Sequence, residues 1–195
     1  MGLVSRRALL ARAGTGAGVV ALLGVSAAPA MAAPGEGDLA NVRLVCSTKR
    51  LMVNWYTTWL DTPKAAGPVQ TQQLVRTIRK QEQTHYAKLA PLLGATAPVD
   101  DDFTFTFPAG ALRTPVTAET FALALEYLAT GIAVGAAPRV LDDGVAGTLT
   151  SVVACEGQHL AALSALGGGS PVPTDLPAGL DIVDASDQLS QFLSN

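Results

Sequence analysis

The sequence predicts an all-α fold, a four-helix bundle with one long crossover between the second and third helices. Four stretches have the composition and apolar spacing of helices, at 38–61, 70–93, 117–137 and 140–166. Short loops join the first helix to the second and the third to the fourth, whereas the segment 94–116 separates the two pairs. This order of short, long and short connections is typical of a bundle with one long crossover.

The N-terminal residues 1–33 have the features of an export signal and are set apart from the fold. Arg6 and Arg7 precede an apolar stretch, and small residues end it near Ala32, where we expect cleavage of a twin-arginine signal. An uncleaved membrane anchor is the alternative interpretation. No later segment reaches the roughly 18 unbroken apolar residues of a spanning helix. We therefore expect an exported, extracytoplasmic protein with no membrane contact beyond the signal peptide.

Glycine, proline and capping residues set the expected boundaries. Thr117 is the expected N-cap of the third helix, and the expected helix ends are marked by Pro63, Gly94, Pro138 and Gly167. The bundle therefore spans 34–167, and 168–195 forms a Pro/Gly-rich tail with room for a short helix around 185–193. Within the crossover, the alternating Phe and Thr of 103–108 predict an extended segment lying across an apolar surface.

Charge and cysteine content exclude several function classes. The net charge is −3, and it is near −6 once the three arginines of the signal are removed, so we expect no nucleic-acid partner. Two cysteines, Cys46 and Cys155, are too few for a disulfide framework or a structural zinc knuckle. Their expected separation along the bundle favours two buried thiols over a disulfide. Protein partners cannot be named from the sequence.

Both histidines of the chain follow a glutamate by three positions. The motifs are Glu82-x-x-His85 and Glu156-x-x-His159, in a chain with few glutamates, and the residues around them repeat at a constant offset. This repeat indicates an internal duplication of a helix. Each pair lies in the middle of the apolar stripe of its helix, so the sequence predicts that all four side chains point into the core.

Buried glutamate and histidine are costly unless they are paired or bind a metal. In di-iron and di-manganese bundles, two helices each supply Glu-x-x-His and the other two helices each supply one Glu. The third helix offers Glu126, whereas the first has Asn54 at the expected position. The predicted ligands are therefore Glu82, His85, Glu126, Glu156 and His159. Because Asn54 replaces a glutamate, the site is expected to be asymmetric, mononuclear or empty.

Several segments match a known family. They are Phe103–Pro108, Glu126-Tyr127 followed by Gly131, Val134–Pro138, and Glu156–Leu163. Over about 70–167 the chain resembles the ferritin-like superfamily, and it is most similar to exported ferritin-like domain proteins that include desiccation-related members. The resemblance implies a four-helix bundle with a di-iron or di-manganese centre. It is weak over the first helix.

Two functions are compatible with these observations. The first is an exported ferritin-like protein that binds iron or manganese in the bundle core and, if active, oxidises metal or disproportionates peroxide. The second is a metal-free bundle in which the Glu–His pairs form a polar network, acting as a non-catalytic extracytoplasmic interaction or stress-protection module. Counting the metal bound per chain distinguishes them. If Asn54 occupies the sixth ligand position, Asn54→Glu should raise that count toward two.

Overall fold

The structure, a computed structural model, describes residues 35–172 and 175–193. The expected export signal at 1–33 lies outside the described residues. The long helices are α2 (Glu36–Leu60), α3 (Val69–Leu93), α4 (Pro115–Ala136) and α5 (Asp143–Leu166), and a short helix α6 (Ile182–Ser190) lies in the tail. Single 3₁₀ turns cover Gly94–Thr96, Asp100–Asp102 and Ala137–Arg139. The described part of the chain has helices and no strand beyond one isolated bridge, which confirms the all-α prediction.

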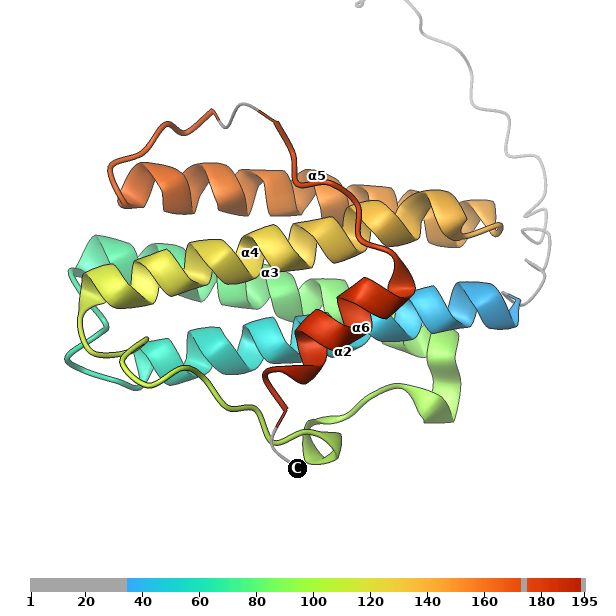
Figure 1. Cartoon of the computed structure of the whole chain (residues 1–195), viewed down its shortest axis with the longest axis horizontal. Helices are drawn as coiled ribbons and strands as arrows, with labels where there is room; N and C mark the ends of the chain where they lie inside the picture. Colours follow the sequence, from blue (N-terminus) through green and yellow to red (C-terminus); the bar gives the residue numbers. More distant parts are fainter. Residues whose placement is uncertain (1–34, 173–174, 194–195) are drawn as a thin grey trace, which may run out of the picture. The chain divides into compact units, whose positions relative to one another are not determined.

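The four long helices lie side by side as a bundle (Figure 1). A short loop makes α3 antiparallel to α2, and another makes α5 antiparallel to α4. The connection from α3 to α4 returns along the bundle, so these two helices run in the same direction. The long crossover therefore lies where the spacing of the helices predicts it.

Polar side chains fix the helix starts. Thr114, and not Thr117 as predicted, is the N-cap of α4, and its hydroxyl accepts a hydrogen bond from the Thr117 backbone N–H. Asp142 caps α5 in the same way. The buried carboxylate of Asp38 on α2 accepts hydrogen bonds from the backbone N–H groups of Leu141 and Asp142, both at 3.0 Å. These contacts tie the start of α2 to the start of α5.

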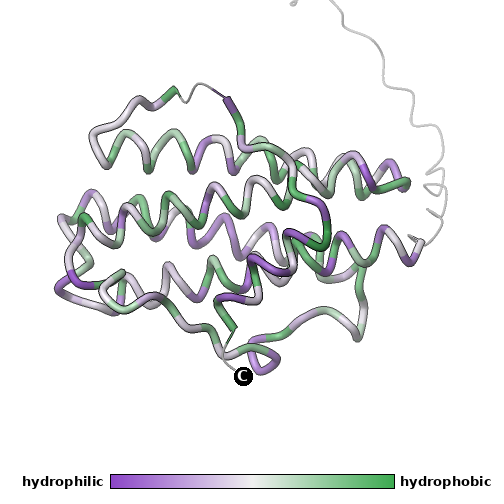
Figure 2. The backbone as a smooth tube through the Cα atoms, in the orientation of Figure 1, coloured by the Kyte–Doolittle hydropathy of each residue, from purple (hydrophilic) through white to green (hydrophobic). Residues whose placement is uncertain are grey.

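The apolar core runs along the whole bundle. Hydrophilic and hydrophobic residues alternate along the long helices (Figure 2), as expected of helices that bury one face. Trp55 on α2 is fully buried and packs edge-on against Phe107 of the crossover and Phe121 of α4, with ring centroids 5.0 and 4.6 Å away. The Phe/Thr segment thus lies over an apolar surface, as its alternation predicts.

The tail packs against the bundle. Helix α6 contacts α4 and α2, and the bridge between Phe105 and Leu193 joins the tail to the crossover. The segment Pro115–Arg139 is long and apolar enough to cross a membrane by length and composition alone. In the bundle, however, 56% of the most apolar 18-residue stretch of this segment is buried, as in the core helix of a folded domain.

We expect Gly135→Ala to weaken the docking of the tail. A Cβ atom at Gly135 would lie 1.8 Å from the Leu180 backbone oxygen, so the segment around Leu180 must move. Overpacking of this kind costs about 1–3 kcal/mol. Gly147→Ala on α5 is the matched control, since a Cβ there meets nothing within 4 Å and alanine favours the helix. Thermal unfolding should show a lower midpoint for the first variant only; equal midpoints would contradict the close approach.

Candidate metal centre

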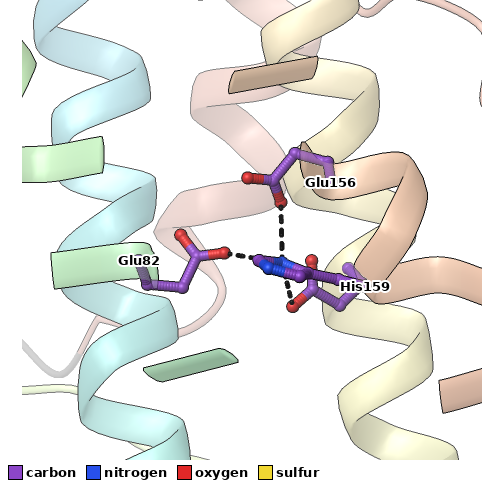
Figure 3. A group of neighbouring side chains, drawn as sticks. Glu82, Glu156 and His159 are labelled. Carbon is purple, nitrogen blue, oxygen red and sulfur yellow. Dashed lines mark ion pairs between the residues drawn. The ribbon is translucent and has the colours of Figure 1, made fainter. Parts of the chain in front are cut away.

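A cluster of acidic and imidazole groups lies inside the bundle. Ligand atoms of Glu82 on α3, Glu126 on α4, and Glu156 and His159 on α5 all lie within 4.8 Å of one another, and the four residues are buried. Figure 3 shows the Glu82 and Glu156 carboxylates directed at the His159 ring. The apolar stripes predicted for α3 and α5 are responsible, because Glu82 and Glu156 replace apolar residues on the buried faces of their helices.

The His159 imidazole is central to the cluster. Its Nδ1 atom lies 3.2 Å from Glu82 Oε1, 3.4 Å from Glu126 Oε1 and 3.8 Å from Glu156 Oε2. Its other nitrogen, Nε2, lies 3.0 Å from the side-chain oxygen of Gln81, which can only accept. Gln81 therefore fixes a proton on Nε2 and leaves Nδ1 as the nitrogen that faces the carboxylates, as the hydrogen-bond partners of metal-bound histidines commonly do.

His85 lies at the edge of the same cluster. Its Nδ1 atom is 3.2 Å from Glu156 Oε1 and 3.7 Å from Glu82 Oε2, and its ring stacks on that of His159 with centroids 6.1 Å apart. His85 also lines a cavity of about 360 Å³ between α3 and α5. Exposed residues at this cavity include Lys88 and Ser151. The cavity therefore connects His85 with the surface.

Helix α2 contributes Lys49, and the interpretation of Asn54 as the sixth position is wrong. The Lys49 ammonium lies 2.9 Å from Glu82 Oε2 and 2.7 Å from Glu156 Oε1, with no exposed side-chain surface. Asn54 is exposed. It follows Lys49 by five residues, which rotates it about 140° around the helix axis. The prediction that Asn54→Glu adds a ligand is therefore withdrawn, because the new carboxylate would point to solvent.

Tyr56 is the second residue of α2 at the centre. Its hydroxyl donates a hydrogen bond of 2.5 Å to Glu126 Oε1 and is fully buried. Lys49 and Tyr56 are seven residues apart, which places them two turns apart on one face of α2. Each of the four long helices therefore supplies at least one polar side chain to the cluster.

The three carboxyl groups of the cluster differ in the direction in which their surroundings shift the pKa. Burial raises the pKa of all three, and repulsion from neighbouring carboxylates adds to this for Glu126 and Glu156. For Glu82 and Glu156, attraction to Lys49 and contacts with the histidines outweigh burial and lower the pKa. For Glu126, burial and repulsion from Glu156 raise the pKa to about 8. At neutral pH the metal-free cluster therefore holds two carboxylates and one protonated acid.

The pKa values of the three basic groups in the cluster are all raised. Burial lowers the pKa of Lys49, but attraction to Glu156 and Glu82 outweighs it, so the pKa is raised and the ammonium is charged. Burial also opposes the charging of His159, yet its contacts with Glu126 and Glu82 raise the pKa to about 11. The pKa of His85 is raised by Glu156 and Glu82 against the effect of burial. The cluster is thus a network of opposite charges in the buried core.

Several atoms of this network lack a well-directed hydrogen bond. The buried side-chain atoms without such a bond include Glu82 Oε1 and Oε2, Glu126 Oε2, Glu156 Oε2, His85 Nδ1 and His159 Nδ1. Buried polar groups are usually satisfied, so a group of them facing one interior space needs an explanation. Carboxylate oxygens and imidazole nitrogens are the ligands that iron, manganese and zinc take in proteins. The donor set therefore fits a transition metal ion, although Lys49 occupies part of the space.

The comparisons agree with this geometry. The sequence model of the ferritin-like domain family matches residues 30–168. The chain belongs to the ferritin-like domain family. No curated protein and no solved structure matches the chain. For this ferritin-like protein, the bundle and the buried Glu/His cluster together permit a metal site.

The structure brings together all five residues predicted as ligands in this ferritin-like protein, with His85 outside the tightest group of four. Sequence reasoning missed Lys49, Tyr56 and Gln81. A signal for the first two is present, because one stripe on α2 advances by 3, 4, 3, 4 and 3 residues through Val42, Val45, Lys49, Met52, Tyr56 and Trp59. The two cysteines are free, with Cys46 buried and Cys155 partly exposed.

Proposed function

We propose that this protein is an exported metal-binding member of the ferritin-like family, with iron or manganese held by Glu82, Glu126, Glu156 and His159 and with His85 beside them. The observation that carries the proposal is the group of buried ligand atoms without directed hydrogen bonds that face one another across three helices. A divalent ion would balance the charge of these buried carboxylates directly.

The residues around the centre have separate tasks in this proposal. Glu82 and Glu156 are ionised without metal and supply charge directly, whereas Glu126 must release its proton before it can bind an ion. Gln81 keeps the Nδ1 lone pair of His159 available once that nitrogen loses its proton. A bound iron or manganese would supply redox chemistry with oxygen or peroxide. Tyr56 holds Glu126 in place through its hydroxyl.

The cavity beside His85 supports access from solvent. It is lined on α5 by small or hydroxylated residues, among them Gly144, Gly147, Thr148 and Ser151. A cavity of about 360 Å³ leaves room for ions and small oxidants. We propose that they reach the centre between α3 and α5.

Export and partners are part of the same proposal. The Arg6-Arg7 signal supports an extracytoplasmic location. The resemblance to desiccation-related members supports a role in stress protection. The acidic charge supports the absence of a nucleic-acid partner.

One observation favours the second candidate, a metal-free, non-catalytic bundle. The Lys49 ammonium already lies between Glu82 and Glu156 and balances part of their charge without any metal. In this case the cluster is a buried ion network that stabilises a module for interaction or stress protection.

Metal binding by Glu126→Gln separates the two candidates. Glutamine resembles the protonated Glu126 of the metal-free protein, so we expect the fold to persist while Mn²⁺ affinity falls at least tenfold, as ligand loss requires. Glu119→Gln, on the same helix but outside the cluster, should bind as the wild type does. Equilibrium dialysis with Mn²⁺ or Fe²⁺ measures both. A wild-type content below about 0.1 ion per chain after reconstitution would refute metal binding.

A further inference from the structure

The position of Lys49 bears on how many ions the centre can hold. Its ammonium contacts one carboxylate oxygen of Glu82 on α3 and one of Glu156 on α5, at 2.9 and 2.7 Å. Two carboxylates from facing helices thus converge on one position and share one cation there. The cation between Glu82 and Glu156 is the ammonium of Lys49, a side chain of the protein itself.

Charge balance leads to the same conclusion. The described part of the cluster has three carboxyl groups, those of Glu82, Glu126 and Glu156. One divalent ion and the Lys49 ammonium together carry three positive charges, which balance three carboxylates. Two divalent ions with Lys49 would leave two uncompensated positive charges in a buried core, and buried net charge is strongly disfavoured.

The two nitrogens nearest the centre also differ in what they face. His159 Nδ1 points to all three carboxyl groups, at 3.2 to 3.8 Å. His85 Nδ1 points to the oxygens that Lys49 contacts, Glu156 Oε1 and Glu82 Oε2. The His159 side is therefore free for an ion, whereas the His85 side is shared with the ammonium.

We propose that the Lys49 ammonium takes the place of one of two metal ions, so that the centre holds a single divalent ion on the His159 side. This inference rests on the proposed metal-binding function and concerns its stoichiometry. It makes Lys49 a positioning residue, which holds Glu82 and Glu156 by charge without binding the metal itself.

The test compares wild type with Lys49→Glu after reconstitution with Mn²⁺ alone. The variant removes the ammonium and adds a fourth carboxylate on the same face of α2, so four carboxylates can balance two divalent ions. We expect one ion per chain in the wild type and two in the variant, measured by elemental analysis. Lys80→Glu makes the same change of charge at an exposed position of α3 and should leave the count at one.

Spectroscopy provides a second readout on the wild type, which stands even if Lys49→Glu does not fold. An electron paramagnetic resonance spectrum of an isolated Mn²⁺ ion supports the inference, and the spectrum of an exchange-coupled pair overturns it. Two ions per wild-type chain, or no gain in Lys49→Glu, would also overturn it while leaving metal binding intact. A wild type without metal counts against the proposed function, and the gain of an ion in Lys49→Glu then tests the role of Lys49 separately.

Discussion

Lys49→Met should lower the free energy of unfolding of the metal-free protein by about 3–5 kcal/mol, the cost of removing one partner from a buried ion pair. The ammonium has no exposed surface and contacts two carboxylates that are also buried. Methionine fills a similar volume, so the loss reflects the uncompensated charge of Glu82 and Glu156 rather than a cavity. Urea unfolding in the presence of a chelator measures the change.

Lys80→Met is the matched control, because it removes the same charge from an exposed position on α3. Surface substitutions of this kind usually change stability by less than about 0.5 kcal/mol. Addition of Mn²⁺ should restore much of the stability lost in Lys49→Met, since the ion supplies the missing positive charge. If both variants unfold at the same urea concentration as wild type, Lys49 does not hold the carboxylates.

The metal-free protein should lose stability as the pH rises from about 5 to 8. Glu126 has a pKa of about 8 in the folded protein against 4.5 as its ordinary value, so the folded state retains a proton that the unfolded chain releases. His159, with a pKa of about 11 against 6.5, contributes stability that is fully present below pH 6.5 and is lost as the pH rises toward 11. Each group lowers the free energy of unfolding by up to about 1.4 kcal/mol per pH unit in its interval.

At acidic pH the dependence reverses, and the free energy of unfolding falls as the pH falls. Glu82 and Glu156 have lowered pKa values, so the stability they contribute is present above pH 4.5 and is lost as the pH falls through their folded pKa values. Stability should therefore be highest near pH 5. Urea unfolding in chelator across this range measures the curve. Glu126→Gln should flatten it between pH 4.5 and 6.5, where His159 contributes no change, whereas the exposed Glu36→Gln should not. A wild-type curve that is already flat there would show that Glu126 is ionised in the folded state.

The sequence by itself determined the helices α3, α4 and α5 and the residues they bring together. The stripe on α5 through Leu149, Glu156 and His159 is buried as predicted. Local periodicity suffices for α3 and α5 because the buried residues of each helix form one stripe, so the spacing of its apolar residues fixes which side chains face the core.

Only the tertiary structure decided the contribution of α2. This helix is covered by α3, α4, α6 and the crossover, and its buried residues extend around most of its circumference. Because these buried residues spread over a wide arc, the stripe through Lys49 and Tyr56 does not stand out in the sequence, and the spacing from the other motifs suggested Asn54 as the sixth position. Packing against these neighbours turned Lys49 and Tyr56 inward instead. The character of the centre, three acids and two imidazoles around a built-in ammonium, follows from that rotation.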